Sequence, residues 1–262
     1  MKRILFAALC LAALHTSARA ADTSLTAAKQ KGKLVLGLDD SFPPMGFRNE
    51  DNQIVGYDID VAKEVAKRLG VQLQPQAIDW NAKEQELNTG KIDCIWNGFT
   101  ITEERKQAML FTRPYLRNAQ VVVVKKGAPY ATLASLKGKK VGLQAGSSAA
   151  GALEGAKDFR ASLKQVVEFK DNLTALMDLE ARGVDAVVMD LIVAEDNIKR
   201  SGKPYSVLQE SLAPEVFGVG FRKKDVALRD AVQGALEAMA KDGTLAQVTT
   251  KWFGSDISVV GK

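Results

Sequence analysis

The chain has 262 residues, of which 46% are hydrophobic and 26% are charged, and its formal net charge is +5. This length is enough for two lobes that each bury a hydrophobic core. The sequence has no run of basic residues interleaved with aromatic ones. We therefore do not expect nucleic acid as a partner.

The first twenty residues have the pattern of a secretory signal peptide. Lys2 and Arg3 precede an apolar run over residues 4–14, and a small-residue segment ends at Ala20. The run is shorter than the roughly 20 apolar residues of a membrane span, and Cys10 lacks the small preceding residue that a lipoprotein site requires. We expect cleavage after residue 20 and export to the periplasm, with an uncleaved anchor as the alternative.

Cleavage changes the chemistry available to the chain. It removes His15, the single histidine, and Cys10, so that Cys94 is the one remaining cysteine. A chain without histidine has no Ser-His-Asp or Cys-His machinery and no zinc site built from histidine and cysteine. We expect no metal and no cofactor, and we expect Cys94 to lie buried in an apolar strand. Loss of the signal's three basic residues lowers the formal charge from +5 to about +2.

Strand-like and helix-like segments alternate along the remaining chain. Helices are predicted at residues 58–69 and 171–182, each followed by a glycine. In the second we expect the core-facing side to carry Leu173, Leu176, Met177 and Glu180. Such alternation is typical of parallel α/β architecture. Apolar runs predict strands at residues 33–38, 71–76, 92–96, 121–125, 140–143, 166–169 and 185–189.

Residues 88–115 combine an apolar strand, a polar turn at residues 97–100 and a helix that starts near Thr102. Arg105 falls in the first turn of that helix. A guanidinium beside the free N–H groups of a helix start suits bidentate recognition of a carboxylate. The alternative is a surface arginine that pairs with its neighbouring glutamates.

Polar residues follow the carboxyl ends of four predicted strands. In open parallel sheets, ligands bind at this edge, where loop and helix N–H groups point. We therefore expect one cleft lined by the segments 39–42, 97–100 and 144–148 and by Asp190.

Several segments resemble those of the polar amino-acid-binding proteins of bacterial ABC transporters, solute-binding protein family 3. Each is a weak pattern alone, but their order and spacing together are specific. The segments are residues 34–47 (LVLGLDDSFPPMGF), 56–62 (GYDIDVA), 88–115, 136–142 (LKGKKVG), 183–190 (GVDAVVMD), 242–244 (DGT) and 251–254 (KWFG).

The resemblance implies the two-lobed type II periplasmic binding protein fold, an α/β fold in which each lobe is a sheet flanked by helices. It places lobe 1 in residues 21–117 and 217–262 and inserts lobe 2 as residues 118–216. The two hinge crossovers are expected near residues 116–121 and 214–220, which both look extended.

The resemblance also implies roles for individual residues. Arg105 matches the arginine that binds the ligand's α-carboxylate, and Asp190 matches the aspartate that binds its α-ammonium. Further ligand contacts are expected from residues of the turn and of the second lobe's loop: Gly98, Thr100, Gln144, Ser147 and Ser148.

The expected side-chain pocket has aromatic walls. Phe42 and Trp80 match positions whose rings flank the ligand, although either could instead be core packing. Asp39 lies at the base of the same loop, and Asn97 replaces the small residue usual before the glycine. These residues favour a cationic or long polar ligand, with arginine or lysine ahead of glutamine or histidine.

The sequence thus predicts a monomeric receptor that binds a free amino acid and delivers it to an inner-membrane ABC permease with its ATPase. An enzyme similar to the dehydratases of this fold is one alternative. It needs a cleft acid that is free to donate a proton, whereas we expect Asp190 to be ionised and paired. A ligand-sensing module is another alternative.

Overall fold

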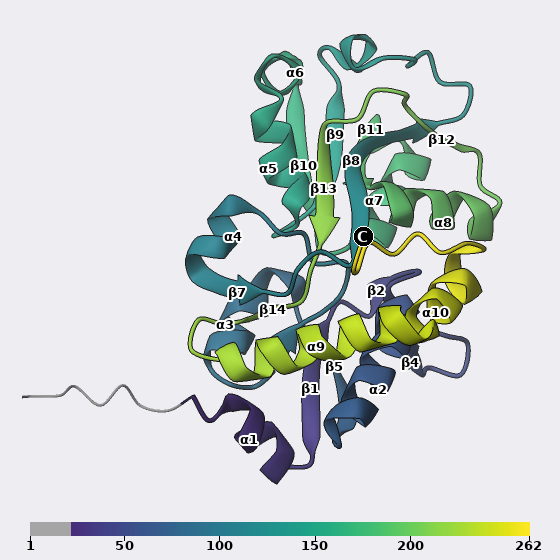
Figure 1. Ribbon diagram of the computed structural model, residues 1–262. Helices are drawn as coiled ribbons and strands as arrows, with labels where there is room; N and C mark the ends of the chain where they lie inside the picture. Colours follow the sequence, from purple (N-terminus) through teal and green to yellow (C-terminus); the bar gives the residue numbers. More distant parts are fainter. Residues whose placement is uncertain (1–21) are drawn as a thin grey trace, which may run out of the picture.

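The computed structural model describes residues 22–262, and Figure 1 shows them folded into two lobes. The first lobe, at the bottom of that view, contains both the N-terminal helices α1 to α4 and the C-terminal helices α9 and α10. The second lobe, at the top, carries α5 to α8. The signal peptide expected over residues 1–20 lies outside the described residues.

The first lobe is built on a mixed five-stranded sheet in the order β5-β1-β6-β14-β7. β1 runs parallel to β5 and β6, whereas β14 runs antiparallel to β6 and β7. The last strand in the sequence thus completes a sheet that the N-terminal strands begin. The strands are β1 (Lys33–Leu38), β5 (Gln72–Ala77), β6 (Cys94–Ile95), β7 (Met109–Phe111) and β14 (Gly220–Arg222).

Helices and a small antiparallel sheet surround this five-stranded sheet. The small sheet has the order β2-β3-β4, with β2 (Ser41–Phe42), β3 (Gly46–Arg48) and β4 (Ile54–Val55). The helices are α1 (Ser24–Gln30), α2 (Tyr57–Leu69), η1 (Trp80–Ala82), α3 (Lys83–Asn88), α4 (Glu103–Ala108), α9 (Val226–Asp242) and α10 (Thr244–Phe253).

The second lobe is built on a sheet in the order β10-β9-β11-β8-β12, and β13 also pairs with β8. Its strands are β8 (Leu116–Lys125), β9 (Lys140–Gln144), β10 (Gln165–Phe169), β11 (Ala186–Asp190), β12 (Tyr205–Val207) and β13 (Ala213–Phe217). Its helices are η2 (Leu133–Leu136), α5 (Ser148–Gly155), α6 (Lys157–Ser162), α7 (Asn172–Ala181) and α8 (Leu191–Ser201).

β8 and β13 connect the lobes as an antiparallel pair, from Leu116 opposite Phe217 to Gln120 opposite Ala213. Isolated bridges join this pair to the first lobe, between Thr100 and Phe217 and between Leu116 and Ser258. The two linking segments therefore lie side by side (Figure 1). Bending of two paired strands moves the lobes relative to each other without breaking either sheet.

The two predicted helices differ in how well their core faces were anticipated. α2 buries Ala62 and Val65 and ends at Gly70, which has a left-handed φ of 75°. In α7 the expectation was partly wrong: Leu176 is buried as expected, but Leu173, Met177 and Glu180 are exposed, Met177 by 64%. Apolar and polar residues are only weakly separated onto opposite faces of this short helix, so the packing of the neighbouring strands sets its orientation. Its buried side chains are Asn172, Ala175, Leu176 and Leu179.

The predicted strands lie close to their expected positions, and their apolar residues form the core of each lobe. Strand β1 begins and ends at the expected residues, and its residues from Leu34 to Leu38 are buried. Cys94 is a buried free cysteine in β6, as expected, and burial raises the pKa of its thiol. It therefore behaves as a small core side chain.

Candidate functional site

All eleven residues that the sequence singled out line one cavity between the lobes. Its volume is about 10 Å³, which is room for about one water molecule. The lobes are thus closed on each other, and anything larger requires them to separate. The lining residues are Asp39, Phe42, Trp80, Asn97, Gly98, Thr100 and Arg105 from the first lobe, and Gln144, Ser147, Ser148 and Asp190 from the second.

Arg105 is held in this cavity by the start of α4. Thr102 caps the helix by accepting a hydrogen bond from the Arg105 N–H at 3.1 Å. The guanidinium donates to the carbonyl oxygen of Thr100 at 2.9 Å and to that of Gly146 at 3.1 Å, and it lies 4.4 Å above the Phe99 ring. The side chain is buried, so it is not the exposed arginine of the alternative reading.

The charge of Arg105 is incompletely compensated by the protein. Burial lowers the pKa of the guanidinium, and the more distant carboxylates of Glu215, Glu84 and Asp190 oppose that shift. Among residues 22–262 no carboxylate forms an ion pair with Arg105; its partners are carbonyl oxygens. A buried guanidinium without a paired anion is suited to an incoming carboxylate.

Asp190 is the last residue of β11 and precedes α8. Its side chain is buried, and its Oδ1 accepts a hydrogen bond from Asn118 Nδ2 at 2.6 Å. Burial raises the pKa of Asp190 to about 7, and the charge of Glu215 adds to this rise. Desolvation thus outweighs the hydrogen bonds of Asp190 and opposes, in the closed protein, the ionised form that we expect when an ammonium pairs with it.

Asp39 and Gln144 connect the lobes at the other end of the cavity. Gln144 Nε2 donates to Asp39 Oδ2 at 2.7 Å, and Ser41 Oγ donates to Asp39 Oδ1 at 2.6 Å. Burial raises the pKa of the Asp39 carboxyl group. Asn97 accepts from the Asp39 N–H at 3.1 Å, so this asparagine braces the loop that carries Asp39.

The two aromatic residues have mixed surroundings. Phe42 belongs to the main hydrophobic core and also lines the cavity. Trp80 packs edge-on against Phe99, with ring centroids 5.7 Å apart, and it also lines the cavity. Gly98 lies beside Phe42 with a φ of 55°, and a Cβ there would be 2.9 Å from Phe42 Cε1. Glycine thus allows the turn to approach the Phe42 ring.

The sequence reasoning missed four polar residues around the cavity: Lys83, Asn118, Gln120 and Glu215. Lys83 is buried and donates to the carbonyl oxygen of Gly146 at 2.7 Å, which joins the two lobes. Burial, followed by the charge of Arg105, lowers the pKa of Lys83 to about 8. The other three lie on the strands that link the lobes. The sequence feature that could have identified these three residues is that each is polar within an otherwise apolar, extended segment.

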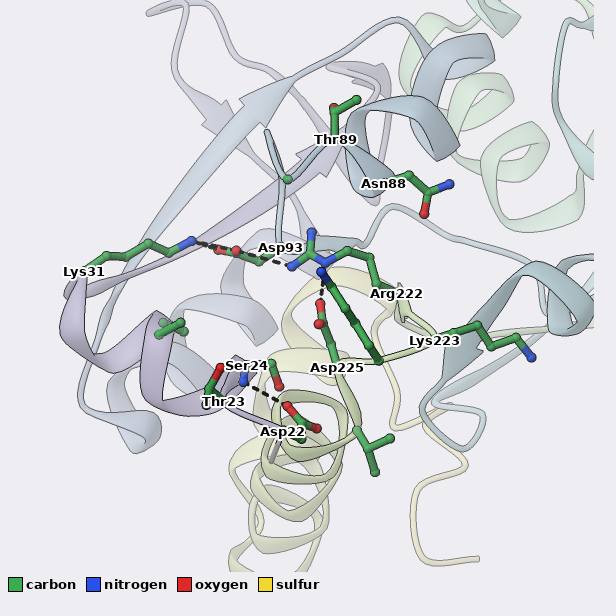
Figure 2. Close-up of a pocket in the computed structure, with 15 residues that line it drawn as sticks. Asp22, Thr23, Ser24, Lys31, Asn88, Thr89, Asp93, Arg222, Lys223 and Asp225 are labelled. Carbon is green, nitrogen blue, oxygen red and sulfur yellow. Dashed lines mark hydrogen bonds and ion pairs between the residues drawn. The ribbon is translucent and has the colours of Figure 1, made fainter. Parts of the chain in front are cut away.

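A second cavity, of about 820 Å³, opens on the first lobe between α1 and the start of α9. Figure 2 shows four of its charged side chains, those of Lys31, Asp93, Arg222 and Asp225, paired with one another, whereas Lys223 points away from them. Lys31 contacts Asp93 at 2.6 Å, and Arg222 Nε contacts Asp225 at 2.5 Å. It contains none of the residues that the sequence predicted. The central charges of this second cavity are already neutralised by one another. The smaller cavity between the lobes, where Arg105 has no paired carboxylate, is therefore better suited to bind a charged ligand.

The described residues contain neither a membrane-spanning helix nor a metal-binding cluster. No helix within residues 22–262 is long and apolar enough to cross a membrane. No group of three or more histidine, cysteine, aspartate or glutamate side chains in that range could hold a metal ion.

Two α/β lobes joined by paired strands, with a polar cavity between them, define a type II periplasmic binding protein. The particular family follows from comparison with known proteins. The model of the bacterial extracellular solute-binding proteins, family 3, matches residues 34–255. The chain belongs to this family, so the resemblance inferred from its sequence is confirmed.

Three relatives illustrate the similarity. The L-cystine-binding protein TcyJ of Escherichia coli (strain K12) is 32% identical over 242 residues, which cover 89% of this chain and 87% of TcyJ. Tv2483, in a crystal structure bound to L-arginine, is 36% identical with a TM-score of 0.88, and the match covers 92% of this chain and 98% of Tv2483. The third is the ancestral amino acid-binding protein AncCDT-1, a precursor of cyclohexadienyl dehydratase. It is 32% identical with a TM-score of 0.81, over 88% of this chain and 99% of AncCDT-1.

Proposed function

We propose that this protein is a periplasmic receptor that binds a free amino acid between its lobes and delivers it to an inner-membrane ABC permease with its ATPase. The observation that carries the proposal is the pairing of charges in one cavity. Arg105, from the first lobe, offers a guanidinium for the α-carboxylate. Asp190, from the second lobe, offers a carboxylate for the α-ammonium.

Binding of a zwitterion by both groups would couple ligand to lobe closure. Each charge of the ligand contacts a different lobe, so only the closed form makes both contacts. We place the lobe boundaries at residues 117/118 and 216/217, where β8 and β13 lie paired. An open form is needed for entry, since the closed cavity holds about 10 Å³.

The charges around the cavity favour a ligand with a cationic side chain. Lys83 and Arg105 are cations, while Asp39, Asp190 and Glu215 are carboxylates. When the ligand's ammonium pairs with ionised Asp190 and the other four groups are also ionised, the site has a net charge of −1, which a ligand of charge +1 neutralises. Arginine or lysine therefore ranks ahead of glutamine or histidine. The L-arginine bound to Tv2483 supports this order, whereas the cystine named for TcyJ is a competing possibility.

A thermal-shift screen of the twenty amino acids and cystine tests the receptor proposal. A ligand at about a thousand times its dissociation constant should stabilise the protein by roughly 4 kcal/mol, which raises the melting temperature by about 10 °C. The Arg105→Ala variant is the control and should show at most about half of this shift at the same ligand concentration. If no compound stabilises the wild-type protein, the receptor proposal is wrong.

An enzyme of the dehydratase type is the second candidate function. The raised pKa of the Asp190 carboxyl group, about 7, favours it, since such an acid can donate a proton near neutral pH. The relationship of AncCDT-1 to a dehydratase is consistent with it. Incubation of the protein with each stabilising compound, followed by mass spectrometry, separates the two. Turnover that Asp190→Asn abolishes would favour the enzyme over the receptor.

A further inference from the structure

Glu215 occupies the centre of a polar network at the base of the cleft. It lies on β13, and its Oε2 accepts hydrogen bonds from four side chains. Thr100 Oγ1 and Gln120 Nε2 each lie 3.0 Å from it, and Asn118 Nδ2 and Ser148 Oγ each lie 3.2 Å away. One carboxylate oxygen is therefore contacted by the first lobe, by the linking strand β8 and by α5.

This network determines where the hydroxyl hydrogens of Thr100 and Ser148 point. A carboxylate only accepts hydrogen bonds, and an amide NH₂ only donates them. Thr100 therefore donates to Glu215. Ser148 accepts from Gln120 Nε2 at 3.2 Å and donates to Thr100 Oγ1 at 3.1 Å or to Glu215. Each hydroxyl has given away its hydrogen and retains one lone pair, so in the cleft both can act only as acceptors.

The same network includes Asp190. Asn118 Nδ2 donates both to Asp190 Oδ1 at 2.6 Å and to Glu215 Oε2 at 3.2 Å, so one amide bridges the two carboxylates. Asp190, Thr100 and Ser148 all line the cavity. Three acceptors in one cluster match a primary ammonium group, which has three N–H donors and no acceptor.

We propose that Glu215 is a positioning residue that makes this part of the cleft selective for the ligand's α-ammonium. It acts by drawing the hydroxyl hydrogens of Thr100 and Ser148 away from the cavity. This inference rests on the proposed receptor function and deepens it. A glutamine at this position keeps its amide oxygen toward Asn118 and Gln120, which only donate, but it lacks the negative charge. A neutral oxygen holds the hydroxyl hydrogens less strongly, so they are freer to point at the ligand and repel an ammonium.

The test compares amino acids with their deaminated analogues in the Glu215→Gln variant. The probe pairs are L-arginine with 5-guanidinopentanoate and L-lysine with 6-aminohexanoate, and displacement calorimetry measures the weaker member. We expect the variant to bind the amino acid about tenfold to a hundredfold more weakly, while the analogue changes by less than about threefold. Glu168→Gln is the matched control, because Glu168 is an exposed glutamate on strand β10.

A purely structural role would weaken both members of a pair equally, and that result would overturn the proposal. Circular dichroism shows whether Glu215→Gln folds. If it does not, Glu215→Asp retains the charge while moving the oxygen back by one methylene, and it should show a smaller loss of the same selectivity. Unchanged selectivity in a folded variant overturns the role of Glu215 alone. A wild-type protein that binds none of the twenty amino acids overturns the receptor proposal and this one together.

Discussion

The protonation of Asp190 should make amino-acid binding depend on pH. In the closed protein, burial raises the pKa of this carboxyl group to about 7. An ammonium pairs only with the ionised carboxylate, so below pH 7 the ligand must expel a proton before it binds. The free amino acid remains a zwitterion between pH 5 and 8. Affinity should therefore fall as pH decreases, and binding should release a proton.

The size of the effect follows from the ionised fraction. With a pKa of about 7, about nine-tenths of Asp190 is ionised at pH 8 and about one-hundredth at pH 5. The dissociation constant should therefore rise by one to two orders of magnitude over this range, or about 1–3 kcal/mol. The slope should approach one tenfold change per pH unit below pH 6.

Isothermal titration calorimetry from pH 5 to 8, in buffers of different ionisation enthalpy, measures both the affinity and the released proton. Asp58 is the main confounding group, because burial also raises its pKa to about 7 and it accepts a hydrogen bond from the Gly98 N–H at 2.7 Å. The Asp190→Asn variant separates the two carboxyl groups and should give a flat profile. A flat profile in the wild type, or a slope retained in Asp190→Asn, would refute the reasoning.

Three further predictions concern the same site. Arg105→Ala should weaken amino-acid binding by about 2–5 kcal/mol in calorimetry. Arg105→Lys should weaken it nearly as much, because an ammonium presents no planar fork. Tight binding by either variant contradicts the carboxylate role of Arg105. Gly98→Ala should lower the free energy of unfolding by about 1–2 kcal/mol in urea titration, because its φ of 55° is left-handed; an unchanged midpoint counts against this. Small-angle scattering should show a smaller radius of gyration with a saturating amino acid than without it, and identical profiles would exclude the hinge motion.

The sequence by itself determined the positions of most helices and strands and the kinds of polar side chain that follow the ends of the strands. Strand β1 was predicted at the observed residues, because its apolar run and the adjoining glycine are local signals. The eleven cavity residues were also found from the sequence, through strand-end positions and through resemblance to a family. Their roles in binding remain predictions.

Only the tertiary structure decided which face of α7 is buried and which residues complete the site. Met177 is exposed because packing against the neighbouring strands, rather than the helix's own weak pattern, sets its orientation. Glu215 reaches Thr100 across 115 positions of the chain, because an antiparallel bridge joins Thr100 to Phe217 on the same strand, β13. A hydrogen bond of that kind depends on long-range strand register, which no local pattern encodes.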